Sequence, residues 1–413
     1  MTQLPDDFVR ETRLTMGEER FSRFLEAFDE EPPISLRLNP RKAFGATLSM
    51  GHEEVPWCKE GCYLEGRPQF TFDPLFHAGC YYVQEAASMF ISHILRQLVE
   101  APVRMLDLCA APGGKSTAAI AALPEGSRLV SNEPNPTRAQ ILLENITKWG
   151  WPNCTVTNNY PRDFRKAKQQ YDLILCDVPC SGEGMFRKDM QTISEWSPQN
   201  VEKCWRLQRE IVADAWQCLV PGGILIYSTC TFNTKENEEN IRWILEEYEA
   251  EVVDIPTEPS WGITGSLLEG FNAPVYRFIP GITRSEGLFV CVMRKSGKWK
   301  EESGKRKVES GKRKEERGKR IVPQHQGLNV CSLQLPSSTL RQDVPYSEAL
   351  RYLRGEALVL PPDTPRSIVT ITYRGIPLGP VKNIGNRANN LYPKPWRIKT
   401  THLPEEPIEI ITK

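Results

Sequence analysis

The sequence predicts an α/β protein built on a mostly parallel, doubly wound, Rossmann-like sheet. A small mixed α+β domain is expected before the sheet and a β-rich module after it. From about residue 101, short apolar runs rich in β-forming residues alternate with stretches of helical periodicity. A turn of small residues and glycines joins the first run to its helix, and polar residues follow several later runs. This alternation is typical of βαβ units with helices on both faces of one sheet.

Residues 1–100 are expected to form the small mixed domain. Aromatic residues recur at helical spacing in its first segment, and residues 34–40 alternate as a strand that stops at a proline. The aromatic residues between positions 70 and 82 are expected to lie in the core. Residues 84–91 are expected to open a helix that leads into the next domain.

Residues 101–296 are expected to form the central α/β domain. The expected strands are 103–108, 128–132, 154–158, 171–176, 223–228 and 286–293. The expected helices are 137–149, 199–219 and 235–248.

A basic segment, 297–322, follows the central domain. It repeats a Glu-Ser-Gly-Lys-Arg-Lys pattern with glycine in every repeat and without an apolar heptad seam, so a flexible linker is predicted rather than a coiled coil. Two roles stay open for it: solubility and reach, or nonspecific attraction to an RNA backbone.

Residues 323–413 form the expected β-rich module, with a strand at 367–373. Near its end, cationic and amide residues are interleaved with Tyr392 and Trp396. This mixture favours RNA contact, with phosphates bound by cations and bases stacked on aromatic rings, over a module whose aromatics are only core. The cations singled out are Lys382, Arg387, Lys394 and Arg397, together with Lys399.

The composition fits a packed globular chain of two or three domains. The 413 residues are 40% hydrophobic and 25% charged, with a formal net charge of zero, so any basic surface for a partner must be local. The beginning of the sequence lacks the segments of a secretory signal, and no apolar run approaches the roughly 20 residues of a membrane span. We therefore expect a cytoplasmic monomer with no membrane partner.

Twelve cysteines are irregularly spaced, and a long chain without a secretory signal is expected to keep them reduced. A zinc site built from Cys58, Cys62, Cys80, His52 and His77 is the metal alternative. Its spacing lacks paired Cys-x-x-Cys knuckles, so scattered buried thiols are preferred and no metal is expected.

The turn from Asp107 to Thr117 is the candidate cofactor loop. It lacks the glycine pattern of dinucleotide and phosphate loops, while its small residues allow a ligand to approach the backbone and a helix N-terminus favours a carboxylate. Glu133, after the next strand, is placed to accept hydrogen bonds from both ribose hydroxyls. S-adenosylmethionine fits this arrangement better than a triphosphate. The loop residues expected to bind it are Cys109, Ala110, Ala111, Pro112, Gly113, Gly114 and Lys115.

Two cysteines stand out by position. Cys180 follows one expected strand, in a run that begins at Asp177, and Cys230 follows another. In an open α/β sheet the loops after neighbouring strands converge at one crevice, so the two thiols are predicted to meet over one substrate. A lone cysteine at a strand end is more often structural, but a matched pair favours catalysis.

These motifs together resemble those of the Sun/Nop family of RNA cytosine-5 methyltransferases, and more narrowly the RsmF-type 16S ribosomal RNA enzymes. The matching segments are 82–89, 107–117, Glu133, 177–184, 227–231, 236–238 and 386–394.

The resemblance implies roles for several residues. Cys230 is the nucleophile that adds to carbon 6 of cytosine, and Cys180 assists release of the product. Asp177 contacts the nitrogen edge of the pyrimidine, and Lys115 lies near its exocyclic oxygen. Lys188 is a phosphate or base contact.

The sequence departs from the family pattern at the adenine. Where the family usually has an aspartate that reads the adenine amino group, an ungapped count from Glu133 reaches Tyr160. Three alternatives stay open: Tyr160 stacks on the adenine, Asn159 supplies the polar contact, or Asp163 swings in. Asp177 is also expected to contact the cofactor.

The expected function is methylation of carbon 5 of a cytosine in ribosomal RNA, with 16S RNA favoured and the target base flipped out. The N-terminal domain and the C-terminal module would position the RNA or the small ribosomal subunit. The alternatives are the same reaction on transfer RNA, a ribosome-assembly factor without turnover, and a DNA cytosine-5 methyltransferase that would use Cys180 as its nucleophile.

Overall fold

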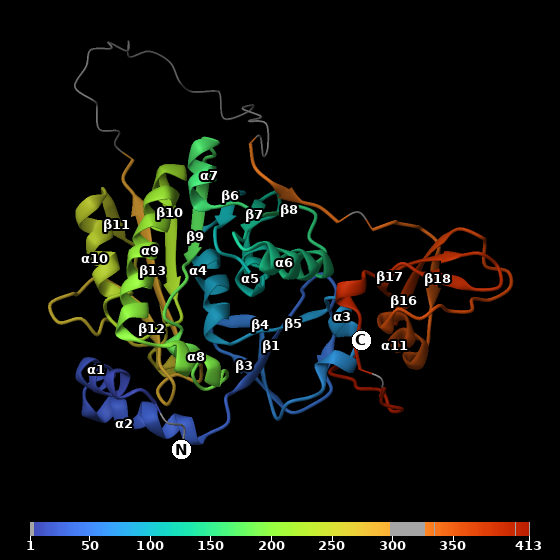
Figure 1. Ribbon diagram of the computed structural model, residues 1–413, viewed down its shortest axis with the longest axis horizontal. Helices are drawn as coiled ribbons and strands as arrows, with labels where there is room; N and C mark the ends of the chain where they lie inside the picture. Colours follow the sequence, from blue (N-terminus) through green and yellow to red (C-terminus); the bar gives the residue numbers. More distant parts are fainter. Residues whose placement is uncertain (1–3, 298–326, 334, 401, 413) are drawn as a thin grey trace, which may run out of the picture.

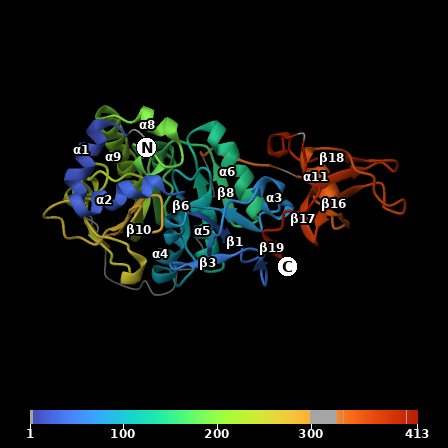
Figure 2. The same ribbon diagram turned by 90° about the horizontal axis from the view of Figure 1, so that it is seen from below.

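The computed structural model describes residues 4–297, 327–333, 335–400 and 402–412 (Figure 1). The basic repeats expected as a linker lie outside the described residues. In both views the C-terminal module lies at one end of the molecule, and helices α1 and α2 lie at the other (Figures 1 and 2).

The chain begins with two short helices, α1 (Asp6–Met16) and α2 (Glu18–Glu26). Gly17 separates them with a φ of 75°, a conformation that glycine adopts at little cost. Their aromatic residues do not pack on the N-terminal sheet. Phe8 and Phe24 instead pack against Phe186 and Phe232. Phe186 follows Cys180 and Phe232 follows Cys230 on the two loops that carry these cysteines.

An antiparallel sheet follows in the order β3-β4-β1-β5. Its strands are β1 (Ile34–Leu38), β3 (His52–Val55), β4 (Cys58–Leu64) and β5 (Tyr81–Val83). The short helix η1 (Ala27–Asp29) precedes β1, and η2 (Phe70–Phe72) and α3 (Pro74–His77) lie between β4 and β5. The strand expected at 34–40 is therefore present.

The helix expected from residue 84 begins later. Residues 84–86 precede η3 (Ala87–Met89) and α4 (Phe90–Leu98). The carboxylate of Glu85 accepts hydrogen bonds from the backbone N–H groups of Ala87 and Ser88, both at 3.0 Å. By accepting these two bonds, the Glu85 side chain ends the extended segment and caps the turn that follows it. The helix therefore begins after residue 86.

The central sheet has the order β11-β13-β10-β9-β6-β7-β8-β14, with β12 paired to β13. Five central strands are parallel: β6 (Arg104–Asp107), β7 (Arg128–Asn132), β8 (Cys154–Thr157), β9 (Tyr171–Asp177) and β10 (Leu219–Thr229). The remaining strands pair antiparallel: β11 (Ala250–Val252), β12 (Tyr276–Phe278), β13 (Leu288–Lys295) and β14 (Val330–Cys331). The predicted α/β class is confirmed.

Helices cover both faces of this sheet (Figure 1). Successive residues of β9 point to opposite faces: Leu173 and Leu175 join the core under α4 and α5, whereas Ile174 and Cys176 join the core under α9 and α10. The helices of this domain are α5 (Gly114–Ala122), α6 (Pro136–Trp149), α7 (Pro161–Lys166), α8 (Met190–Glu195), α9 (Pro198–Cys218) and α10 (Glu238–Glu247), with the short turns η4 (Glu183–Met185) and η5 (Pro259–Trp261).

The C-terminal module is a sheet in the order β15-β16-β17-β18 with one helix against it. Its elements are β15 (Arg341–Asp343), α11 (Tyr346–Arg354), β16 (Ile368–Tyr373), β17 (Ile376–Asn383), β18 (Ala388–Asn390) and η6 (Lys394–Trp396). A later strand, β19 (Ile411–Thr412), pairs with β2 (Thr47–Leu48) of the N-terminal domain.

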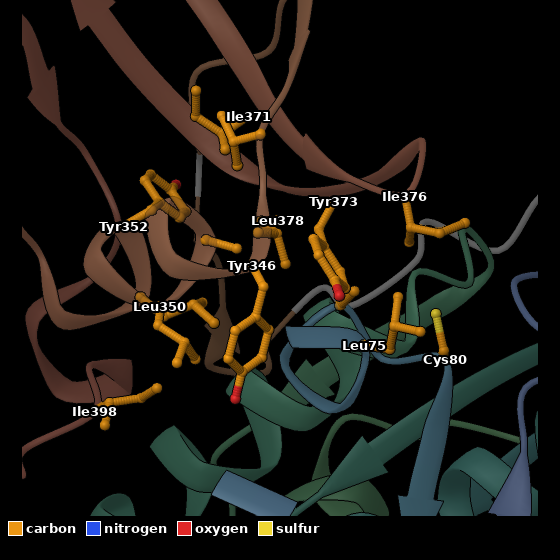
Figure 3. Packing of buried hydrophobic residues seen from close by; sticks show 14 of the residues in the cluster. Leu75, Cys80, Tyr346, Leu350, Tyr352, Ile371, Tyr373, Ile376, Leu378 and Ile398 are labelled. Carbon is orange, nitrogen blue, oxygen red and sulfur yellow. The ribbon is translucent and has the colours of Figure 1, made fainter. Parts of the chain in front are cut away.

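The module and the N-terminal domain share one hydrophobic core (Figure 3). Leu75 and Cys80 of the N-terminal domain join Tyr346 and Leu350 of the module in it. Tyr392 is 2% exposed in the same core. The expectation that Tyr392 offers an exposed ring for base stacking is therefore wrong, because its ring packs against Tyr352 at a centroid distance of 5.4 Å.

Candidate functional site

The two cysteine loops leave the sheet side by side. Strands β9 and β10 are parallel neighbours, with Asp177 opposite Ser228, so the loops after them start at the same level. The Sγ atoms of Cys180 and Cys230 lie 3.2 Å apart. The structure thus brings together the two thiols that the sequence placed after neighbouring strands.

Two buried carboxylates join these loops. Glu236, on the Cys230 side, accepts hydrogen bonds from the Ser181 backbone N–H at 3.0 Å and from Gln208 Nε2 at 2.6 Å. Glu183, on the Cys180 side, accepts from the Phe232 backbone N–H at 2.7 Å. Each carboxylate therefore accepts a hydrogen bond from a backbone N–H of the opposite loop. These bonds hold the two loops together, so they fix the spacing of the two thiols in addition to the direct contact between the sulfurs.

The environment of Cys180 stabilises the protonated form of this thiol. The hydrogen bond with Cys230, followed by burial, raises the pKa of Cys180 well above its ordinary value. Cys180 therefore keeps its proton at neutral pH, although either sulfur can be the donor in the contact between the two thiols. The Cys180 thiol thus lies beside Cys230 as a possible hydrogen-bond donor.

An ion pair lies beside the thiols. Lys115, in the first turn of α5, contacts Asp177, at the end of β9, with Nζ 2.9 Å from Oδ2. Ser228 Oγ donates to the other oxygen of Asp177 at 2.8 Å. Burial lowers the pKa of Lys115, but the charge and hydrogen bond of Asp177 outweigh it, so the pKa is raised and the ammonium stays charged.

These groups open onto a cavity of about 600 Å³. Most of the predicted site residues line it: Cys109, Ala110, Ala111, Pro112, Gly114, Lys115, Asp177, Cys180, Lys188 and Cys230. Gly113, with a φ of 114°, makes the turn into α5 just behind this lining. A ligand of this cavity reaches the loop backbone, the ion pair and both thiols.

Two carboxylate oxygens near the loop fit a zwitterionic adenosine cofactor. Asp107 Oδ1 and Glu133 Oε2 are buried and have no hydrogen-bond partner among the described residues, although Arg138 Nη1 lies 3.5 Å from the latter. Burial raises the pKa of Asp107 to about 7, and the hydrogen bond from Ser116 offsets this only in part. An ammonium and a ribose hydroxyl are donors that would complete these two sites.

The structure does not bring the adenine candidates to the cavity lining. The Asn159 side chain exchanges hydrogen bonds with the backbone of Asn329, at 2.9 and 3.1 Å, and Asp163 accepts from the Tyr160 backbone N–H at 3.0 Å. Tyr160 is 56% exposed, and Arg162 lies over its ring at 4.9 Å.

Sequence reasoning missed the contribution of the N-terminal domain to the cavity. Gln84 follows β5, is buried and lines the cavity. Its Oε1 accepts from Arg37 Nε at 2.8 Å, so its Nε2, which has no described partner, is left as a donor. Arg37 is held in turn by Thr117 Oγ1 at 2.6 Å and by the ring of Trp149 at 4.5 Å.

The signal for this contribution was the segment 82–89, which matches the family pattern but for which we predicted only a helix beginning at residue 84 and no contact with the cavity. Tyr82, Glu85 and Ser88 of this segment also line the cavity, together with Met185, Glu286 and Gly287 from other loops.

The predicted RNA contacts fall into two groups. Lys188 lines the cavity, whereas Lys382, Arg387 and Lys394 are exposed on the C-terminal module. Arg397 donates to the carbonyl of Tyr392 at 3.2 Å, so part of its guanidinium is engaged within the module.

Among the described residues, no helix is long and apolar enough to cross a membrane. In the same residues, no group of three or more histidine, cysteine, aspartate or glutamate side chains is placed to hold a metal ion.

Three family models match successive parts of the chain. The model of the N-terminal domain of 16S rRNA methyltransferase RsmF matches residues 4–86, that of 16S rRNA methyltransferase RsmB/F matches residues 97–294, and that of the methyltransferase RsmF PUA domain matches residues 340–398.

Curated relatives agree with these models. Ribosomal RNA small subunit methyltransferase F of Serratia proteamaculans is 35% identical over 305 residues, and that of Escherichia coli (strain UMN026) is 34% identical over 315 residues. Each alignment covers 71% of this chain and 63% of the relative, so the chain spans less than two thirds of the length of the relatives it matches.

Solved structures share the fold. A methyltransferase homologue from Pyrococcus horikoshii has a TM-score of 0.56 at 25% identity and covers 71% of this chain and all of its own. NSun6 from the same organism, solved with SFG, has a TM-score of 0.57 at 19% identity and covers 70% of this chain and 98% of its own. Three family models match successive parts of the chain, and the curated relatives are named for the same enzyme. The chain therefore belongs to the family of RsmF-type 16S rRNA methyltransferases.

Proposed function

We propose that this protein is an S-adenosylmethionine-dependent methyltransferase that modifies carbon 5 of a cytosine in 16S ribosomal RNA. The observation that carries the proposal is the pair of thiols 3.2 Å apart in a cavity that also contains the Lys115–Asp177 ion pair. The relatives named small subunit methyltransferase F support the choice of substrate. We expect the protein to act as a monomer in the cytoplasm.

The cofactor would be held by the loop 109–114, by Asp107 and by Glu133. Asp107 Oδ1 and Glu133 Oε2 offer buried acceptors for an ammonium and a ribose hydroxyl. When bound, S-adenosylmethionine supplies an electrophilic methyl group. How the adenine is read stays open among Asn159, Tyr160 and Asp163.

Carbon 5 of cytosine is a poor nucleophile until a thiolate adds to carbon 6. In the proposed reaction Cys230 Sγ forms a bond to carbon 6, and the electron pair of the 5,6 double bond makes carbon 5 nucleophilic. Asp177 contacts the nitrogen edge of the ring, and the Lys115 ammonium stabilises the charge that develops at its exocyclic oxygen.

The product must then leave the enzyme. After carbon 5 has gained the methyl group, its proton passes to a base, the 5,6 double bond re-forms and the bond between Cys230 Sγ and carbon 6 breaks. The electron pair of that bond returns to Cys230. Cys180, protonated because its pKa is raised, donates its hydrogen bond to the departing sulfur.

Substitution of the two cysteines tests these roles. Cys230→Ala is expected to abolish methyl transfer to in vitro transcribed 16S RNA, because it removes the proposed nucleophile while the neighbouring Cys180 keeps its proton. Cys180→Ala is expected to accumulate a covalent enzyme–RNA adduct, seen as a shifted band on a denaturing gel. Cys204→Ala, at a thiol outside the cavity lining, is the control and should behave like the wild type.

Transfer that survives Cys230→Ala and is lost in Cys180→Ala would reverse the two roles, as in the DNA methyltransferase alternative. Bisulfite sequencing of ribosomal and transfer RNA from a strain that lacks the gene identifies the substrate. Loss of 5-methylcytosine from transfer RNA alone would favour the transfer RNA alternative. Absence of transfer to any RNA by the wild type would favour an assembly factor.

A further inference from the structure

Two further cavities lie in series with the catalytic cavity, along the boundary between the N-terminal domain, α6 and the C-terminal module. The second cavity, of about 260 Å³, shares Tyr82 and Val83 with the catalytic cavity. The third, also of about 260 Å³, shares His77, Lys148 and Trp396 with the second. We call the second and third cavities together the seam site.

Three buried polar atoms belong to residues that line the seam site, and each lacks a hydrogen-bond partner among the described residues. They are His77 Nδ1, Trp149 Nε1 and Tyr392 Oη. Their residues are 7%, 2% and 2% exposed. Buried polar groups are nearly always paired, so three unpaired ones around one pair of cavities indicate a ligand with hydrogen-bonding groups.

The types of these groups describe the ligand. His77 Nε2 lies 2.8 Å from the Thr71 carbonyl and must donate to it, and burial lowers the pKa of His77 to about 4. The neutral ring therefore presents Nδ1 as an acceptor, while Trp149 Nε1 is a donor. A ligand that pairs with both His77 Nδ1 and Trp149 Nε1 offers a donor to the first and an acceptor to the second, as the edge of a nucleobase does.

Aromatic and cationic groups complete the site. Trp396 is half-buried between the two cavities. Lys148 Nζ lies 5.6 Å from its ring centroid and pairs with Glu144 at 2.5 Å, so its charge is already partnered within the site. Lys394 is exposed two residues away from Trp396. A ring for stacking near an exposed cation for a phosphate is the combination that binds single-stranded RNA.

We propose that the seam site binds a nucleobase of the substrate RNA that flanks the target cytosine, stacked on Trp396. The inference rests on the proposed function in one respect: the strand enters the seam site from the catalytic cavity past Tyr82. It gives the C-terminal module a specific task, which is to form one wall of a second base pocket together with the N-terminal domain.

The test is a binding cycle between protein and RNA variants. A fluorescein-labelled single-stranded RNA of about 15 nucleotides with one central cytosine is titrated with the protein, and binding is followed by fluorescence anisotropy. In a series of such RNAs, an abasic residue replaces each flanking nucleotide in turn. At one flanking position the abasic residue is expected to weaken binding to the wild type about tenfold, since stacking of a base is worth about 1–3 kcal/mol. In Trp396→Ala this penalty is expected to fall below about twofold.

Matched variants separate stacking from loss of structure. Trp396→Phe retains a ring and should keep most of the abasic penalty. Trp151→Ala removes a half-buried tryptophan that lies under Arg41 at 4.1 Å and lines none of the three cavities, so it should keep the full penalty. Tyr392→Phe removes only the unpaired Oη hydroxyl and should weaken binding of intact RNA about threefold without weakening that of the abasic RNA.

The proposal would be overturned if, at every position, the abasic penalty were the same in the wild type and in Trp396→Ala. It would also be overturned if Trp151→Ala reduced the abasic penalty as much as Trp396→Ala does. The cycle measures binding alone, so it is independent of turnover. Coupling at Trp396 without methyl transfer would contradict only the proposed function, and methyl transfer without coupling would contradict only the seam site.

Discussion

At the scale of single residues, the site shows what position along the chain can and cannot predict. Cys180 and Cys230 were predictable because each follows a strand, and neighbouring parallel strands end at one edge. The raised pKa of Cys180 was not predictable, because it depends on the 3.2 Å contact with Cys230. Gln84 was not predictable either: its orientation is set by Arg37, 47 residues away in the sequence.

Asp107 gives a pH prediction at this scale. Burial raises its pKa to about 7, so the carboxylate needed to bind an ammonium is present above about pH 7 and is lost below it. We expect affinity for S-adenosylmethionine, measured by calorimetry between about pH 5.5 and 7.5, to fall by up to about tenfold per pH unit as the pH decreases.

Asp107→Asn is expected to bind more weakly at pH 7.5 and to lose this slope. Asp172→Asn is the control, because Asp172 pairs with Arg104 away from the cavity lining, and it should keep the wild-type slope. A slope that persists in Asp107→Asn would assign the titration to another group.

At the scale of elements, the strands of the central sheet were predicted well because buried parallel strands are continuous apolar runs. The start of α4 was not, because a cap formed by the Glu85 side chain replaces helix over residues 84–86. The antiparallel strand β14 was also unpredicted. It pairs with β8 although the two are about 170 residues apart, and no local pattern encodes such a contact.

The loops after β9 and β10 give a second prediction. In Glu236→Ala the Ser181 N–H, Gln208 Nε2 and Asn233 Nδ2 lose their shared acceptor. The free energy of unfolding is expected to fall by about 3 kcal/mol. The kcat for methyl transfer is expected to fall at least about tenfold with little change in the KM for RNA, because the thiols lose their fixed spacing rather than their access.

Chemical denaturation and steady-state kinetics measure both effects. Glu202→Ala removes a partly exposed carboxylate that pairs with Lys235 and Arg206, so it should leave the stability nearly unchanged. Wild-type kcat in Glu236→Ala would show that the carboxylate does not hold the loops.

At the scale of the whole molecule, the N-terminal domain and the C-terminal module form one packed body through their shared core (Figure 3). The sequence predicted both parts but not their contact, since periodicity shows which face is apolar and not what covers it. Tyr346 Oη donates to the Phe72 carbonyl at 3.0 Å, and β19 pairs with β2, so polar contacts fix the same boundary.

A core substitution tests this unity. Leu350, 1% exposed in α11, is expected to cost about 3 kcal/mol of the free energy of unfolding when changed to alanine. Because the core is shared, hydrogen exchange should accelerate in β1 and β4 of the N-terminal domain as well as in the module.

Leu340→Ala, at a leucine that is 40% exposed, is the matched control and should leave the exchange unchanged. Faster exchange confined to residues 341–398 in Leu350→Ala would show that the two parts unfold separately.

The shared core has a consequence for how the chain folds as it is synthesised. The residues of the central sheet that pack together lie mostly between positions 86 and 293, so that domain can complete its core while translation continues. Leu36, Leu64 and Leu75 must wait for partners beyond position 343. The N-terminal part of the chain therefore leaves the ribosome early with an apolar face uncovered, and it is completed only after more than 250 further residues have emerged.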